Sequence, residues 1–205
     1  GQWKRAWFYP KENEGMHEAV QRESKAARDS AGILDASTLG KIDIQGTDAS
    51  EFLNRVYTNA WSKLAIGKCR YGLMLNEDGM VYDDGVTTRL DENHYIMTTT
   101  TGGAATVLGK LEDYLQTEWP ELDVYLTSVT DHYATISVCG PNSKKIISKV
   151  IPNLDLSDEK FPHMSFKNTK IDKVKCRVMR ISFTGEQSYD CLLYTSPSPR
   201  DDGVS

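Results

Sequence analysis

The chain has 205 residues, with 24 Lys+Arg against 29 Asp+Glu, a formal net charge of -5 and 39% hydrophobic residues. This length and composition are typical of a globular protein that buries its own core, and they exclude disordered and collagen-like chains. Because the chain has no basic block and no run of ~18 apolar residues, we expect neither nucleic acid nor a membrane as its partner.

Apolar residues at helical spacing predict helices, and alternating apolar residues predict strands. In chain order, these patterns predict a helix at 14–31, strands at 33–35 and 41–45, a short helix at 48–57, strands at 70–75, 80–82 and 94–100, a helix at 102–116, strands at 124–127 and 134–138, a helix at 140–151 and extended runs within 174–183. The polar turn between 75 and 80 indicates a β-hairpin. Helices and strands mix without strict alternation, so we expect an α+β fold.

The four cysteines and four histidines are isolated in the sequence. No Cys-x-x-Cys pair is present, and a free cysteine in an apolar run is usually a small buried hydrophobe. We therefore expect no metal site and a reducing, cytoplasmic setting.

Two adjacent carboxylates, Asp83 and Asp84, follow the hairpin turn. If the segment is extended, their side chains point to opposite faces, so one can be solvated while the other faces the interior. An inward carboxylate can accept a proton, although a solvated turn explains the pair as well. Tyr71, on the partner strand, can lie beside the inward carboxylate or simply be half-buried.

Two further segments carry polar groups beside glycines. Residues 98–103 (Thr-Thr-Thr-Thr-Gly-Gly) can line a polar ligand near a helix start, or can form an ordinary strand-to-helix cap. Residues 182–186 end a strand in a glycine turn followed by Glu186.

Five motifs in order make the chain resemble a known family: residues 33–37, 67–71, 83–84, 140–142 and 183–186. They resemble the folate-binding domain of the glycine-cleavage T-protein (aminomethyltransferase) superfamily over residues 14–190. Residues 1–5, 35–41, 57–61 and 98–103 are similar to the alpha-subunit family of heterotetrameric sarcosine oxidases. The resemblance implies a T-protein-like α+β domain, truncated at its C-terminal side, with 1–13 as a linker from a missing dinucleotide-binding domain.

The resemblance also implies an activity. Tetrahydrofolate bound in this domain would take the one-carbon unit of oxidised sarcosine, giving 5,10-methylenetetrahydrofolate and glycine. Flavin and NAD are expected elsewhere in a hetero-oligomer with other sarcosine oxidase subunits, and the fragment alone is expected to be inactive.

Site residues follow from the same resemblance. Asp84 matches the family's catalytic aspartate, and the residues matching its folate contacts are Leu39, Tyr71, Thr99, Thr100, Phe183 and Asp190. At position 190 the family has a glutamate that pairs with the pterin's amino edge. Glu186 is a weaker candidate.

The last residues of the chain do not fit this resemblance. Residues 191–201 resemble a translated transposase-type sequencing adapter. We therefore expect a glutamate at position 190 in the natural chain, which would continue beyond it, and a foreign tail at 191–205 without function or fold.

Two alternative functions remain open from the sequence. One is a stand-alone aminomethyltransferase or a dimethylglycine-dehydrogenase-like enzyme; the T-protein usually has Leu or Ile after its aspartate pair, where this chain has Gly85. The other is a non-catalytic folate-binding assembly factor, which usually lacks the paired aspartates and carries a cysteine motif near its glycine-rich segment.

Overall fold

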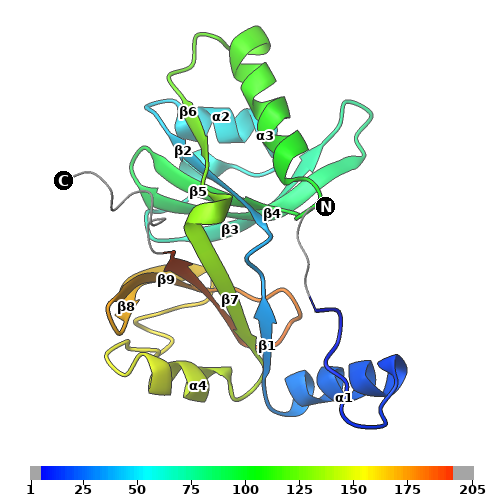
Figure 1. The fold of residues 1–205 in the computed structure, drawn as a ribbon. Helices are drawn as coiled ribbons and strands as arrows, with labels where there is room; N and C mark the ends of the chain where they lie inside the picture. The colour runs from blue at the N-terminus through cyan, green and yellow to red at the C-terminus, as the bar shows by residue number, and fades with distance from the viewer. Residues whose placement is uncertain (1–5, 196–205) are drawn as a thin grey trace, which may run out of the picture.

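The computed structural model describes residues 6–195 and contains two antiparallel sheets of five strands each (Figure 1). Sheet A has the order β1-β7-β10-β9-β8, with strands Gly32–Asp35, Tyr133–Cys139, Ser188–Tyr194, Val174–Arg180 and Ser165–Ile171. Sheet B has the order β3-β4-β5-β2-β6, with strands Cys69–Leu75, Val81–Asp91, His94–Thr99, Gly40–Gln45 and Tyr125–Ser128.

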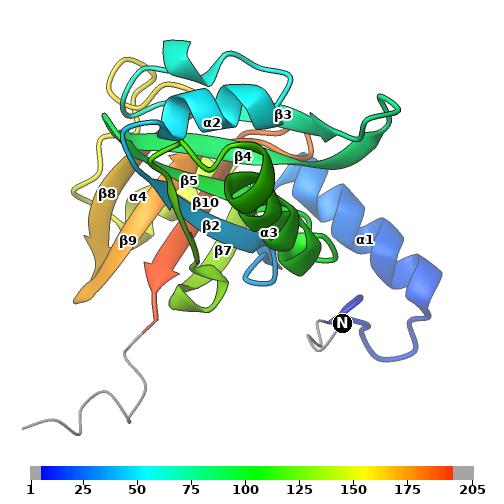
Figure 2. The ribbon, with the colours of Figure 1, turned by 90° about the horizontal axis from the view of Figure 1, so that it is seen from above.

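Helices cover the outer faces of the two sheets (Figures 1 and 2). The helices are α1 (Met16–Asp29), α2 (Ala49–Val56), α3 (Ala104–Asp113) and α4 (Ser143–Val150), with single turns η1 (Trp61–Lys63), η2 (Tyr114–Glu118, π-helical) and η3 (Thr130–His132). Helices α2 and α3 lie on sheet B, α4 lies on sheet A, and α1 extends from one side (Figure 2).

Each sheet has an apolar core under its helices. In α2, Phe52, Leu53 and Val56 share one face because they are three and four residues apart, and they pack on sheet B. In α4, Ile147 is buried against sheet A with Tyr189 of β10. Burial of each such side chain contributes roughly 1.5–3 kcal/mol, so these faces hold the helices to the sheets.

A third core lies between the two sheets. Cys69 and Ile96 of sheet B pack there with Met179, Ile181 and Leu192, which come from sheet A and the end of β9. At one corner the backbones meet directly, since Cys69 N–H donates to the Met164 carbonyl at 2.8 Å. The inward faces of sheets A and B therefore form one continuous interior.

The segment before α1 is anchored along that helix. The Tyr9 N–H donates to Glu23 Oε1 at 2.7 Å, and Arg22 Nη2 donates to the Tyr9 carbonyl at 2.7 Å. Arg22 also binds Glu14 at 2.7 Å. The part of the expected 1–13 linker that the structure describes is thus folded back on α1.

Most of the expected helices and the hairpin are confirmed, with four corrections. Residues 174–183 hold one strand, β9, which ends at Arg180, where two extended runs were expected. Strand β4 does not end at 82: it continues through the aspartate pair to Asp91. Pro141 is not the first helical residue, because Asn142 is the N-cap of α4. The segment 191–194 belongs to β10, paired with β7 and β9, so the expectation that 191–205 carries no fold is wrong for these four residues. Residues 196–205 and the motif at 1–5 lie outside the described residues.

Within residues 6–195, no helix is long and apolar enough to cross a membrane. The same residues contain no cluster of three or more His, Cys, Asp or Glu side chains that could hold a metal ion.

Candidate functional site

The two aspartates of β4 face opposite sides of sheet B, as expected for an extended segment. Asp83 is the inward one: it is 6% exposed, and its Oδ2 accepts the Thr100 N–H at 3.2 Å. A Cβ placed on Gly103 would lie 3.0 Å from the same oxygen. Asp83 thus fixes the turn that leads into α3, and this role requires a glycine at 103.

Asp84 lies on the other face of β4, together with Val86, which packs into the core between the sheets. Its Oδ2 accepts the hydroxyl of Tyr71 on β3 at 2.7 Å. This bond favours the neutral phenol, so it raises the pKa of Tyr71. The structure therefore brings Tyr71 to a carboxylate, as expected, but to the less buried one of the pair.

The threonines at the end of β5 are engaged in local hydrogen bonds. Thr98 Oγ1 accepts the Val86 N–H at 2.9 Å and donates to the Val86 carbonyl at 3.2 Å. Buried Thr99 donates to the Thr100 carbonyl at 2.9 Å, and Thr100 Oγ1 accepts the Gly103 N–H at 3.1 Å. Thr100 thus fixes the turn before α3 by accepting the N–H of Gly103, which is the N-cap residue of that helix.

The turn before β2 lies beside this threonine segment. Half-buried Leu39 donates its N–H to the Ala36 carbonyl at 3.2 Å, which closes the turn. The hydroxyls of Thr38 and Thr101 are 3.0 Å apart, and Gly40 pairs with Thr99 across the ladder. Leu39, Thr99 and Thr100 are therefore neighbours at one end of sheet B.

Sheet A contributes a polar strip opposite this end of sheet B. Along β10, Tyr189 and Cys191 face the α4 side, so Asp190 faces sheet B. Burial raises the pKa of Asp190, while a hydrogen bond from Ser137 and the charge of Lys41 oppose that rise. Position 190, which the sequence assigned to the pterin edge, is thus a partly desolvated carboxylate between the sheets.

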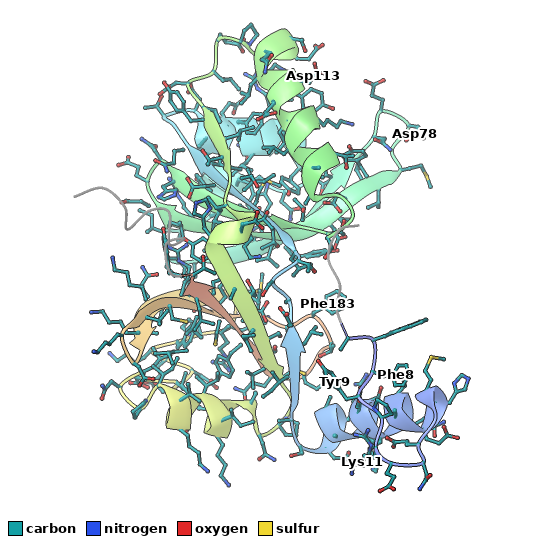
Figure 3. All side chains as sticks on the ribbon, in the orientation of Figure 1. Phe8, Tyr9, Lys11, Asp78, Asp113 and Phe183 are labelled. Atoms are coloured by element: carbon teal, nitrogen blue, oxygen red, sulfur yellow. The ribbon has the colours of Figure 1, made fainter. Side chains whose placement is uncertain are left out.

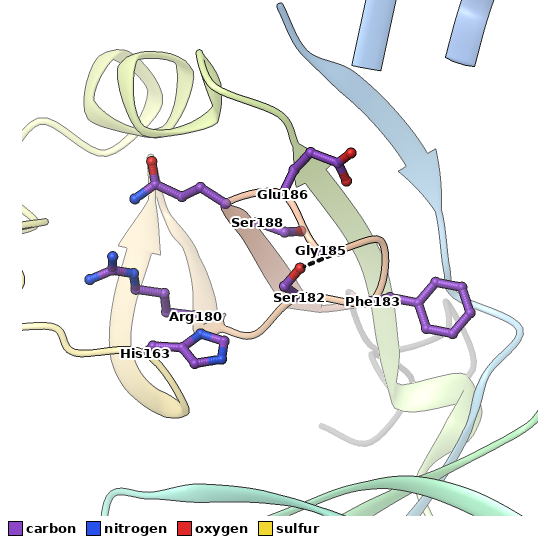
Figure 4. A pocket seen from close by; sticks show the side chains of 8 residues that line it. His163, Arg180, Ser182, Phe183, Gly185, Glu186 and Ser188 are labelled. Atoms are coloured by element: carbon purple, nitrogen blue, oxygen red, sulfur yellow. Dashed lines mark hydrogen bonds between the residues drawn. The ribbon is translucent and has the colours of Figure 1, made fainter. Parts of the chain in front are cut away.

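Phe183 and Glu186 lie apart from the Tyr71–Asp84 pair. Phe183 is 97% exposed on the loop between β9 and β10 (Figure 3). The two residues line a polar pocket whose other walls are His163, Arg180, Ser182, Gly185, Gln187 and Ser188 (Figure 4). Glu186 forms an ion pair with Arg28 of α1 at 2.8 Å.

A sequence profile of the GCVT N-terminal domain matches residues 1–198. The chain belongs to this family. It is 56% identical over 194 residues to the sarcosine oxidase subunit alpha of Corynebacterium sp. (strain U-96), covering 94% of this chain and 20% of that protein. The Rhizobium meliloti (strain 1021) subunit is 47% identical over 193 residues, covering 93% and 20%. The aminomethyltransferase of Exiguobacterium sibiricum is 30% identical over 178 residues, covering 87% and 47%.

Solved structures share the fold of this GCVT domain. The aminomethyltransferase T of Bartonella henselae aligns with a TM-score of 0.73 and 24% identity, covering 86% of this chain and 45% of that one. A chain of the heterotetrameric sarcosine oxidase from Corynebacterium sp. U-96, in complex with pyrrole 2-carboxylate, aligns with a TM-score of 0.54 and 16% identity, covering 86% and 83%. The chain spans about a fifth of the sarcosine oxidase subunits and about half of the aminomethyltransferases that it matches.

In this GCVT domain Lys41 is an interior residue that the sequence pattern alone did not indicate. The side chain is 1% exposed and lies on the face of β2 that looks toward sheet A. The signal was the alternation at 41–44: Ile42 and Ile44 form the apolar face, and Lys41 shares the opposite face with Asp43. A face with two charges indicates solvent, and only the packing of sheet A on it shows that it is covered.

Proposed function

We propose that this GCVT domain is the folate-binding part of a sarcosine-oxidase-type alpha subunit. The proposed reaction passes the one-carbon unit of oxidised sarcosine to tetrahydrofolate, giving 5,10-methylenetetrahydrofolate and glycine. The observation that carries the proposal is the Tyr71–Asp84 hydrogen bond of 2.7 Å at the residues that match the family's site. The 56% identity to a sarcosine oxidase subunit alpha, against 30% to an aminomethyltransferase, favours the oxidase over a stand-alone transferase.

In this proposal a reduced pterin would lie against the residues between the sheets. The amino edge of a pterin presents N–H donors, and a carboxylate such as that of Asp190 accepts two of them well. Within residues 6–195, the buried Thr135 Oγ1 on the same face of sheet A has no hydrogen-bond partner. This hydroxyl is therefore available to a polar ligand between the sheets. Leu39 supplies an apolar neighbour at the opposite wall.

Each of the remaining site residues has a part in the proposal. Asp190 would hold the amino edge, with Leu39, Thr99 and Thr100 forming the turn against the ring and Phe183 at the rim. Tyr71 would contact the folate beside Asp84. Glu186 forms an ion pair with Arg28 and would help to hold the loop that carries Phe183.

In this proposal Asp84 would accept a proton that a folate nitrogen loses when it bonds to the one-carbon unit. When bound, tetrahydrofolate supplies two nitrogens that form bonds to the one-carbon unit, while both bonds from that carbon to the amine nitrogen break and two protons leave on glycine. The Tyr71 hydroxyl donates to the Asp84 carboxylate and fixes its orientation, and this carboxylate would accept a proton from a nitrogen.

The rest of the proposed enzyme lies outside this domain. Flavin and NAD would bind elsewhere in a cytoplasmic complex with the other sarcosine oxidase subunits. The sarcosine imine would reach this domain from the flavin, and oxygen would reoxidise the flavin to give hydrogen peroxide.

The decisive experiment is Asp84→Ala in the full-length subunit assembled with its partners. Loss of an acid–base group costs ~10²–10⁴-fold, so formation of 5,10-methylenetetrahydrofolate should fall by that factor while peroxide production continues. The matched control is Asp78→Ala, at the exposed tip of the β3–β4 hairpin (Figure 3). Unchanged folate product in the Asp84 variant would remove Asp84 from this role.

A further inference from the structure

Lys41 is a buried cation in the interior between the two sheets. Its side chain is 1% exposed on β2, and Lys41 pairs with Thr98 across the ladder to β5. Removing an ammonium group from water is costly unless other groups replace the lost hydration. The contacts of Lys41 therefore show which groups replace the water that its ammonium group has lost.

The ammonium group holds the turn that precedes β2. Nζ donates to the Ser37 carbonyl at 3.0 Å and to the Leu39 carbonyl at 2.9 Å. An ammonium group has three N–H donors, so these two bonds leave one for the space between the sheets. The backbone of Lys41 is fixed as well, because its N–H donates to Thr130 Oγ1 at 3.0 Å and its carbonyl accepts the Val129 N–H at 2.8 Å.

Three carboxylates from three different elements act on this charge. They are Asp35 at the end of β1, Asp131 in η3 and Asp190 in β10. Burial lowers the pKa of Lys41 to about 8, and these three charges limit the fall. Burial raises the pKa of Asp190, and the charge of Lys41 opposes that rise. Lys41 is the one cation with this effect among residues 6–195.

We propose that Lys41 is a positioning residue for the folate site: its ammonium group fixes the turn that carries Leu39 and places a positive charge in the interior that the carboxylate at position 190 faces. The inference rests on the proposed function, because it assigns that carboxylate and Leu39 to the pterin. An ionised carboxylate accepts two N–H bonds from an amino edge, whereas a protonated one presents a hydroxyl to one of those donors. Lys41 thus supplies a positive charge to the interior in which the position-190 carboxylate would meet the pterin.

The test compares Lys41→Met with Lys41→Arg in the full-length polypeptide assembled with its partner subunits. The probe is 5-formyltetrahydrofolate, a stable analogue, and its affinity is measured by calorimetry from pH 6 to 9. A hydrogen bond to a charged group contributes ~1.5–3 kcal/mol, so Lys41→Met should weaken binding ~10- to 100-fold at pH 7. Lys41→Arg should restore most of the affinity, and the kcat for amine oxidation should not change in either variant. Lys63→Met, at an exposed lysine of η1, is the control and should bind like the wild type.

The pH profile separates positioning from a structural role. Lys41→Met has no side chain at position 41 that loses a proton near pH 8, so its affinity should show no fall there. The wild type should lose its advantage above about pH 8, where Lys41 gives up its proton. An equal loss at every pH, together with a lower unfolding midpoint, would make Lys41 merely structural, and wild-type affinity in Lys41→Met would overturn the inference. If Lys41→Met does not fold, Lys41→Gln is measured in the same way. A wild type that binds no folate analogue would instead overturn the proposed function itself.

Discussion

Gly85 follows the aspartate pair, and its substitution by alanine tests how β4 is held against β5. A Cβ at this position would lie 2.7 Å from the Thr98 carbonyl carbon and 3.1 Å from Thr98 Oγ1. Backbone atoms cannot give way as a flexible side chain can, so β4 must move away from β5. The two bonds between Thr98 Oγ1 and the backbone of Val86, at 2.9 and 3.2 Å, would break with that movement.

The expected loss for Gly85→Ala is large for a single methyl group. Overpacking costs ~1–3 kcal/mol and each lost hydrogen bond about 1 kcal/mol, which gives a total of roughly 3–5 kcal/mol. For a chain of this size each kcal/mol lowers the Tm by about 2–4 °C, so the Tm should fall by roughly 10 °C. Because Asp84 directly precedes Gly85, the Gly85→Ala variant should also lose affinity for the folate analogue.

Thermal and urea unfolding of the 205-residue chain measure this loss, with Gly102→Ala as the matched control. Gly102 has no atom within 4 Å of the added Cβ and does not have a positive φ. Its variant should unfold within about 2 °C of the wild type, as surface substitutions away from special features do. If Gly85→Ala were as stable as Gly102→Ala, the close approach of β5 to Gly85 would be refuted.

Three further predictions concern the loop after β9 and the middle of β10. Glu186→Gln removes the charge that pairs with Arg28 at 2.8 Å, so amide exchange at the end of α1 should accelerate. The affinity for the folate analogue should stay unchanged. A tenfold loss of affinity would show that Glu186 belongs to the folate site. Because a nearby hydrogen bond from Thr184 and the Arg28 charge lower the pKa of Glu186, the pair should persist as the pH falls into the ordinary glutamate range and open only below it. Amides of Cys191 and Leu192 should exchange at least ~100-fold slower than in an unstructured peptide, since both residues are buried in β10; fast exchange there would restore the boundary at 190.

The sequence was sufficient for the elements whose signal is local. The helical spacing in α1, the apolar face of α2 and the turn between β3 and β4 each lie within one short segment of the chain, and all three were predicted. The early end assigned to β4 has a physical reason: two aspartates and Gly85 have low strand propensity. Thr100 and Tyr71 hold these residues in the strand through contacts that no local pattern contains.

For the candidate site, the sequence predicted the faces of β4 better than the contacts between the two sheets. Opposite faces for Asp83 and Asp84 followed from the period of a strand, and so did a contact between Tyr71 and one of them. Burial of Lys41 and Asp190 depends on which sheet packs on which face, and that pairing joins residues about 150 positions apart, beyond the reach of periodicity.

The order of strands along the chain has a consequence for folding during synthesis on the ribosome. All of sheet B, from Gly40 to Ser128, is made between β1 and the strand β7 that pairs with it. At ~5–20 residues per second, β1 leaves the ribosome roughly 5–20 s before its partner strand β7. Sheet B can close around α2 and α3 in that interval, whereas sheet A is finished only when β10 emerges and slides in between β7 and β9. The polypeptide thus matures from its middle outwards, and the surfaces that meet at Lys41 and Asp190 are among the last to be joined.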